Sequence, residues 1–196
     1  MVWHESVNIK DIDEEAALWL SPVRRDYINR FRRSGDRHRA IAASLALDRL
    51  LVKHLGLHER EVVIRRDGNG KPFLPDYPEW HFNISHSGQW GVAAISRSHV
   101  VGIDVQQLSS FDREVAQFFM SPREISDIEV LPPGERNFRF TCRWAQCEAY
   151  LKMKGSGVAT LRRGTPVIIP AAVSIILPPL DGSHLLAIAS EALAPA

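Results

Sequence analysis

The chain has 196 residues, of which 45% are apolar and 24% are charged, and its formal net charge at pH 7 is +1. These proportions exclude a disordered tail, a collagen-like repeat and a coiled-coil rod. Two cysteines cannot build a disulfide framework, the first five residues lack the pattern of a signal peptide, and the apolar runs are shorter than the ~20 residues that span a membrane. We therefore expect a cytoplasmic protein without a membrane partner, built as one domain or as two small halves.

The positive charge is concentrated in one segment near the N-terminus. Between residues 24 and 39, seven arginines stand against two aspartates. Such a strip in a nearly neutral protein indicates either a polyanionic partner or a solvated helix face, and the sequence leaves both interpretations open. Because no nucleic-acid-binding motif appears and the net charge is close to zero, we expect no nucleic-acid partner.

The first hundred residues predict helices followed by strands. Residues 13–31 have helical spacing with a break at Ser21-Pro22, because proline suits the first turn of a helix. Asp36 is placed to cap a second helix, which runs to about His54 and ends at Gly56. Further along we expect a strand at residues 62–64, a turn at 67–70, a loop at 71–80, and strands at 81–85 and 90–96.

The second half is also predicted to combine helices with strands. We expect a strand at 100–105, a short helix at 113–120, another from Ser121-Pro122 onward, a long helix at 137–154 that Gly155 ends, and strands at 167–169, 172–177 and 185–189. A long helix followed by strands in each half predicts an α+β fold. Its two similar halves would be residues 1–97 and 98–196.

The strand predicted at residues 100–106 carries polar groups on one face. Strand alternation separates an apolar face from a second face that holds Gly102, Asp104 and Gln106. A carboxylate inside such an apolar run is costly unless it has a partner. Gly102 leaves room for another element to approach that face. Asp104 is therefore a candidate site residue.

The long helix places Trp144, Glu148 and Lys152 on one face, because they are four residues apart. The simplest interpretation is a surface ion pair between Glu148 and Lys152. The functional interpretation brings Glu148 and Asp104 together around a hard cation, because Mg²⁺ prefers carboxylate, water and phosphate oxygens. The spacing alone does not decide between the two.

A serine and a histidine adjoin in the segment Asn83-Ile84-Ser85-His86-Ser87-Gly88. Neighbours on a strand point to opposite faces, so Ser85 and His86 are poorly placed as a nucleophile and its base, and no G-x-S-x-G motif is present. Hydroxyls and an imidazole at a strand end fit phosphate binding better. Lys71, which precedes Pro72 in a glycine-containing turn, is a further candidate for a phosphate contact, although the spacing is not that of a P-loop.

Several segments of the chain match one family in their order and separation. They are residues 70–72 with 81–88, residues 102–106, and residues 144–152 with 155–157; residues 21–39 add a weaker match. Together they resemble the 4′-phosphopantetheinyl transferases of the surfactin-synthetase-activating type. The resemblance implies a pseudo-twofold pair of α+β halves, and two such halves in one chain favour a monomer.

The resemblance also implies an activity and a site. Members transfer the 4′-phosphopantetheine arm of coenzyme A to a serine of an acyl or peptidyl carrier protein in peptide or polyketide synthesis, and adenosine 3′,5′-bisphosphate is the other product. The implied nucleotide contacts are Arg24, Arg39, Lys71, Pro72, Ser85 and His86. The implied ligands of Mg²⁺, or of Mn²⁺, are Asp104, Gln106 and Glu148, and the implied catalytic residues are Glu148 and Lys152.

Two positions depart from the family pattern. Gln106 stands where many members have a third acidic ligand, so the metal site loses a negative charge. Cys147 stands where a lysine usually precedes the glutamate; it is either a passive substitute or a reactive thiol, because a thiolate near cations has a lowered pKa. Two alternatives to an active transferase therefore stay open: a diverged member that binds coenzyme A or a carrier protein without transfer, and an enzyme of changed chemistry. Cys142 and Cys147 are about 140° apart around a helix and should form neither a disulfide nor a zinc pair.

Overall fold

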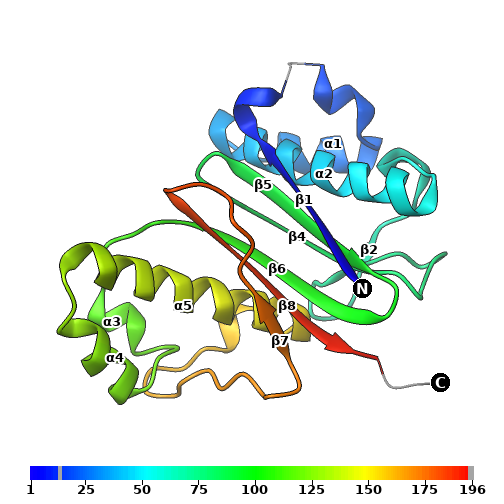
Figure 1. The fold of residues 1–196 in the computed structure, drawn as a ribbon. Helices are drawn as coiled ribbons and strands as arrows, with labels where there is room; N and C mark the ends of the chain where they lie inside the picture. Colours follow the sequence, from blue (N-terminus) through cyan, green and yellow to red (C-terminus); the bar gives the residue numbers. More distant parts are fainter. Residues whose placement is uncertain (13–14, 194–196) are drawn as a thin grey trace.

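The computed structural model describes residues 1–12 and 15–193, with two three-stranded antiparallel sheets and a long helix against each (Figure 1). The first sheet has the strand order β1-β5-β4, formed by β1 (Val2–Asn8), β4 (His81–Ser87) and β5 (Trp90–Ser96). The second has the order β6-β8-β7, formed by β6 (His99–Gln107), β7 (Ser174–Ile176) and β8 (His184–Ala192). The predicted α+β class is confirmed.

The remaining elements are helices and a small hairpin. The helices are α1 (Pro22–Asn29), α2 (Ser34–Leu55), α3 (Arg113–Ala116), α4 (Pro122–Glu129) and α5 (Pro133–Lys154). The hairpin pairs β2 (Arg65–Arg66) with β3 (Pro72–Phe73). One-turn 3₁₀ helices occupy Ile9–Asp11, Ala16–Trp19, Glu59–Glu61 and Val158–Thr160. No helix in the described part of the chain is both long enough and apolar enough to cross a membrane.

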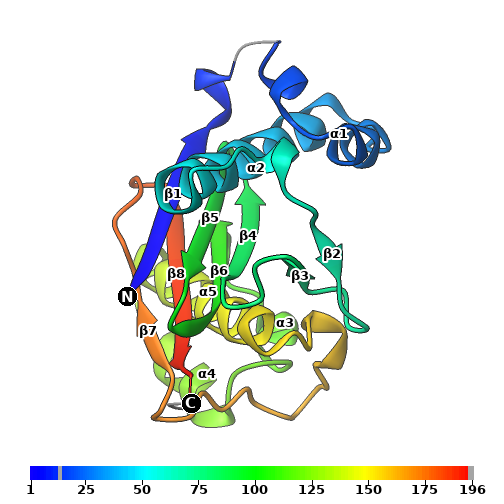
Figure 2. The same cartoon turned by 90° about the vertical axis from the view of Figure 1, so that its right-hand side faces the viewer.

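The core is divided by the alternation of β5. Ala93 and Ile95 pack against the buried face of α2, whereas Val92 and Ala94 pack against strands of the second sheet. Because both faces are covered, β5 is apolar along nearly its whole length. Figure 1 shows α2 and α5 on opposite sides of the strands, and Figure 2 gives the view turned by 90°. The predicted division of the chain into halves 1–97 and 98–196 stays a prediction.

Gly102 sets the distance between α5 and β6. A Cβ atom built on Gly102 would lie 2.1 Å from the backbone oxygen of Ala149 and 2.3 Å from the backbone nitrogen of Met153. A side chain at position 102 would therefore push the helix away from the strand. This close approach brings the polar residues of β6 next to those of α5.

Most predicted helix boundaries agree with the structure. Ser21 caps α1 by accepting a hydrogen bond from the backbone of Arg24, and α2 and α5 end at the predicted glycines 56 and 155. Asp36 is not the cap of α2: it lies in the first turn, and its carboxylate pairs with Arg39. The first two residues of the helix predicted at 13–31, and the last three of the predicted half 98–196, lie outside the described residues.

Two predicted strands are absent, and one long strand was not predicted. Residues 62–64 and 167–169 are not strands, and a strand at residues 2–8 was not predicted. Short apolar runs such as 62–64 become strands only if a neighbour offers backbone hydrogen bonds. That partner is decided by tertiary structure, as it is for β1, whose register pairs Val2 with Ser96.

Candidate active site

Nine of the ten predicted site residues line one cavity of about 420 Å³. Its walls come from α1, the β2–β3 hairpin, β4, β6 and α5, so both halves of the sequence contribute. The nine are Arg24, Lys71, Pro72, Ser85, His86, Asp104, Gln106, Glu148 and Lys152. The tenth, Arg39, is not among the lining residues. Four consecutive residues of β4, from Asn83 to His86, line the cavity because β4 is the last strand of its sheet.

Asp104 is the buried centre of the polar network, with 1% of its surface exposed. Its Oδ1 atom accepts hydrogen bonds from the ammonium of Lys152 at 2.5 Å and from the hydroxyl of Ser85 at 2.9 Å. The Lys152 ammonium also donates to the Ser85 hydroxyl at 2.8 Å. The partner that a carboxylate requires in this apolar strand is therefore Lys152. The simple pair of Glu148 with Lys152 is not formed, since Lys152 crosses to the strand instead.

Gln106 joins the two carboxylates. Its side-chain nitrogen donates to Asp104 Oδ2 at 2.8 Å and to Glu148 Oε2 at 2.5 Å. The pKa of Glu148 is raised to about 7, first by burial and then by the negative charge of Asp104. The positive charge of Lys152 lowers this pKa, but by less than Asp104 raises it. Two acidic groups thus converge on one point where a positive charge would be stabilised.

The donor set fits a hard cation in part. Asp104 and Glu148 offer carboxylate oxygens, and Gln106 would offer its amide oxygen after a rotation of the side chain. Across residues 1–12 and 15–193, no three acidic, histidine or cysteine side chains are grouped as a metal site. A bound Mg²⁺ would therefore need water or ligand oxygens to complete its coordination.

The other wall of the cavity is cationic. The Lys71 ammonium donates to the backbone oxygen of Met153 at 2.5 Å, and burial lowers its pKa to about 8. Partial burial, followed by the nearby charges of Lys152, Arg39 and Arg24, lowers the pKa of His86 below its usual 6.5. A phosphate in this cavity would meet ready-made donors and would favour protonation of both groups.

Arg24 connects α1 to α2 beside the cavity. Its Nε donates to the buried hydroxyl of Ser44 at 2.7 Å, and its guanidinium lies 5.0 Å from the ring centre of Tyr27. Arg66 lies over the same ring at 5.8 Å. Tyr27 and Arg66 line the cavity but were not predicted. The sequence feature that could have identified Arg66 is its position directly before the turn that leads to Lys71.

Of the seven arginines in the basic strip, Arg24 lines the cavity. Arg39 pairs with Asp36 and donates to the backbone oxygen of Gly88, two residues after His86, at 3.3 Å. Arg37 donates to the backbone oxygen of Phe31 at 2.9 Å, and Arg30, Arg32 and Arg33 are exposed. The strip is thus divided between the cavity, the local fold and the surface.

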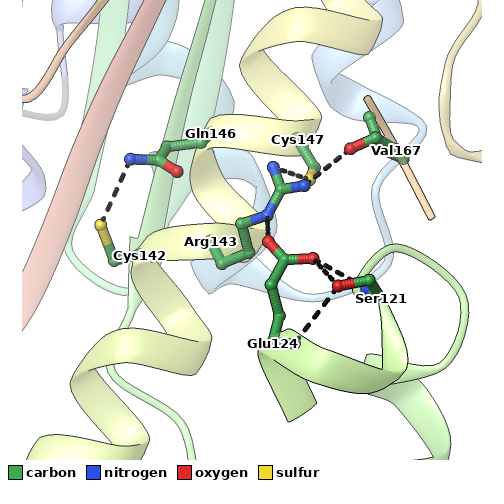
Figure 3. A network of polar contacts seen from close by, with 7 residues as sticks. All are labelled: Ser121, Glu124, Cys142, Arg143, Gln146, Cys147 and Val167. Carbon is green, nitrogen blue, oxygen red and sulfur yellow. Dashed lines mark hydrogen bonds and ion pairs between the residues drawn. The ribbon is translucent and has the colours of Figure 1, made fainter. Parts of the chain in front are cut away.

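Cys147 belongs to the core and does not line the cavity. It is fully buried, its sulfur accepts from Arg143 at 3.0 Å, and Arg143 also binds Glu124 and the backbone oxygen of Val167 (Figure 3). Burial raises the pKa of Cys147 to about 12. The burial and the raised pKa therefore favour a passive substitute over a reactive thiol, and the role of Cys147 stays a prediction. Both cysteines are free thiols in the described part of the chain.

The fold and the site together define a class: an α+β protein whose cavity sets cationic groups against a pair of carboxylates, as a phosphate ester with a bound cation would require. Residues 11–98 match the family model described as 4′-phosphopantetheinyl transferase, N-terminal, and residues 100–173 match that of the 4′-phosphopantetheinyl transferase superfamily. The chain belongs to the 4′-phosphopantetheinyl transferase superfamily, of the surfactin-synthetase-activating type.

Curated relatives give the same assignment. The 4′-phosphopantetheinyl transferase Sfp of Bacillus subtilis is 30% identical over 147 residues, which cover 75% of this chain and 65% of that protein. The transferase psf-1 of Bacillus pumilus is 30% identical over 146 residues, 74% of this chain and 62% of that protein. The transferase HetI of Nostoc is 32% identical over 153 residues, 76% of this chain and 65% of that protein. The chain thus spans somewhat less than two thirds of these relatives.

Proposed function

We propose that the protein transfers the 4′-phosphopantetheine arm of coenzyme A to a serine of a carrier protein and releases adenosine 3′,5′-bisphosphate. One observation carries the proposal: the cationic residues of the first half and the carboxylates of the second half line the same cavity. Phosphoryl transfer asks a protein mainly to position its substrate and to neutralise charge. A cavity with both kinds of group can position the substrate and neutralise its charge.

The two walls would have different roles, nucleotide binding and stabilisation of charge. The nucleotide of coenzyme A would be held by Arg24, Lys71, Pro72, Ser85 and His86, with His86 near the 3′-phosphate. Arg39 would contribute its positive charge from its position beside Gly88. Lys152, held between Asp104 and Ser85, would stabilise charge on the phosphate under attack.

Glu148 is proposed as the base that takes the proton of the carrier serine. Its pKa of about 7 suits a group that must accept a proton near neutral pH. Mg²⁺, or Mn²⁺, would be held by Asp104, Gln106 and Glu148, and it would supply charge neutralisation at the pyrophosphate. The carrier would be an acyl or peptidyl carrier protein of secondary metabolism, and the enzyme would act as a cytoplasmic monomer.

The test is intact-mass analysis of apo-carrier proteins incubated with this protein, coenzyme A and Mg²⁺. A mass increase of one phosphopantetheine arm would support the proposal. Glu148→Gln should slow transfer by at least about a hundredfold, because a positioned acid or base contributes about that much. Glu135→Gln, an exposed change on the same helix, is the matched control.

Two results would contradict the proposal. Transfer at the normal rate by Glu148→Gln would remove this residue from the mechanism. Binding of coenzyme A without transfer to any of several carriers would instead favour the diverged member that has kept the cavity and lost the reaction.

A further inference from the structure

The turn between β4 and β5 is held by residues that lie beyond the matched part of the sequence. The turn carries Gly88 two residues after His86, and the match to the superfamily ends at residue 173. His184, the first residue of β8, packs against Gly88 of this turn, and Asp181, three residues earlier, binds Trp90 at the end of the turn. A segment outside the family match therefore contacts the turn that follows His86.

Asp181 and His184 form a tightly bonded pair. The Nδ1 atom of His184 lies 3.1 Å from both carboxylate oxygens of Asp181. The indole of Trp90, at the start of β5, donates to Asp181 Oδ2 at 2.6 Å, and the backbone of Ser183 donates to Oδ1 at 2.7 Å. Asp181 thus fixes both the ring of His184 and the far end of the turn.

The imidazole of His184 fills the space beside Gly88. His184 is 4% exposed, and its Nε2 atom is buried without a hydrogen-bond partner among the residues that the structure describes. A Cβ atom built on Gly88 would lie 2.1 Å from Nε2, and the φ of Gly88 is +54°. The ring therefore sits in van der Waals contact with the turn, where only glycine fits.

The position of Gly88 matters for two cationic groups. Its backbone oxygen accepts the hydrogen bond from Arg39, and His86 precedes it on the same strand. Arg39 is close enough to His86 to lower the pKa of that imidazole. A shift of the turn would therefore move both groups together.

We propose that Asp181 and His184 are positioning residues: they fix the Gly88 turn and thereby place Arg39 and His86 for the 3′-phosphate of coenzyme A. This inference rests on the proposed function for its ligand. It assigns a role in nucleotide recognition to the C-terminal half.

The experiment compares His184→Ala with the wild-type protein in two measurements. Hydrogen exchange without any ligand should show faster exchange at the backbone amides of residues 87–90, because the ring no longer packs on the turn. Calorimetry should show about tenfold weaker binding of coenzyme A, the effect of one charge-assisted hydrogen bond, and unchanged binding of 3′-dephospho-coenzyme A.

Three variants separate positioning from general damage. His184→Asn keeps a donor toward Asp181 and should restore part of the affinity for coenzyme A. In an Arg39→Ala background, His184→Ala should cause no further loss, since both act on the same contact. Ile188→Val, a buried change on the same strand, should lower stability while keeping the preference for coenzyme A over its dephospho form.

The outcomes are distinct. Unchanged exchange at residues 87–90 in His184→Ala would overturn the inference whatever the ligand. Equal losses for both nucleotides would do the same, because they would indicate a merely structural role. A wild-type protein that binds neither nucleotide would overturn the proposed function, and with it the role of the pair in phosphate recognition.

Discussion

At position 106 an amide stands between two carboxylates where an acid would complete a metal site. Because Gln106 adds no negative charge, we expect weak binding of divalent cations in the absence of substrate. Gln106→Glu should tighten the binding of Mn²⁺ by about tenfold, the effect of one added charged ligand, measured by calorimetry or by electron paramagnetic resonance. Gln107→Glu, on the exposed neighbour, is the control and should bind as the wild type does. Equal affinities in all three proteins would place the cation elsewhere.

His86 should report the arrival of a phosphate. Its pKa is below 6.5 because of partial burial and of the cations around it, so a bound 3′-phosphate should raise that pKa. A titration of the ring by nuclear magnetic resonance, with coenzyme A and with 3′-dephospho-coenzyme A, measures the change. Only the first should raise the pKa markedly; the same pKa in both complexes would remove His86 from the phosphate site.

The lowered pKa of His86 also has a consequence for stability. As the pH falls below 6.5, the unfolded chain takes up a proton at this residue before the folded chain does. The contribution of His86 to the free energy of unfolding is therefore complete above pH 6.5 and decreases below it. His86→Asn should make the acid side of the stability profile flatter, as measured by urea unfolding at several pH values.

Cys147 should resist modification in the folded protein. It is fully buried and its pKa is about 12, so almost no thiolate is available. Treatment with iodoacetamide followed by mass analysis should label Cys147 only after unfolding, and Cys147→Ser should change the transfer rate by less than about threefold, equivalent to well under 1 kcal/mol. Rapid labelling of the native protein, or a large loss of activity in the variant, would reopen a chemical role for this thiol.

At the scale of elements, the contact of α5 with β6 determines the geometry of the site. Gly102→Ala would place a methyl group against the backbone of Ala149 and Met153, so we expect a loss of at least about 2 kcal/mol in the free energy of unfolding and a loss of transfer. The measurement is urea unfolding, together with the carrier assay.

Gly134→Ala is the matched control for this change. Gly134 lies in the first turn of the same helix, and nothing in the described structure is within 4 Å of a Cβ atom built on it. The alanine should leave stability equal or higher by up to about 1 kcal/mol, because it reduces the freedom of the unfolded chain. A stable, active Gly102→Ala protein would show that helix and strand separate without disturbing the site.

At the scale of the whole molecule, the two sheets share a core. Val92 and Ala94 of the first sheet pack with Val101 and Ile103 of the second, and the side chain of Asn83 accepts a hydrogen bond from the backbone of Ile103 at 3.2 Å. We therefore expect residues 1–97 and 98–196 to unfold in one cooperative transition.

The variant Trp144→Phe makes this measurable, because its four remaining tryptophans all lie in residues 1–97. Its fluorescence reports the first half, whereas far-ultraviolet circular dichroism reports both. Coincident urea transitions would confirm a single unit. Two separate transitions would show that the halves are independent domains.

Particular residues show how far a single sequence can be interpreted. Asp104 was recognisable because a carboxylate in an apolar strand requires a partner, and the ends of α2 and α5 were recognisable from their glycines. The strand at residues 2–8 was not, because it depends on a neighbour far away in the chain. The site residues themselves stay predictions until the variants are measured.

The sequence by itself determined the α+β class, the family and the residues that bear charge, because these depend on local pattern and on motifs a few residues long. Only the tertiary structure decided that Lys152 pairs with Asp104, that Gln106 joins Asp104 to Glu148, and that Cys147 faces the core. The first two depend on how closely α5 packs on β6, and the third depends on how α5 packs against α3 and α4. Packing of that kind is a property of many distant contacts acting together, which no local spacing contains.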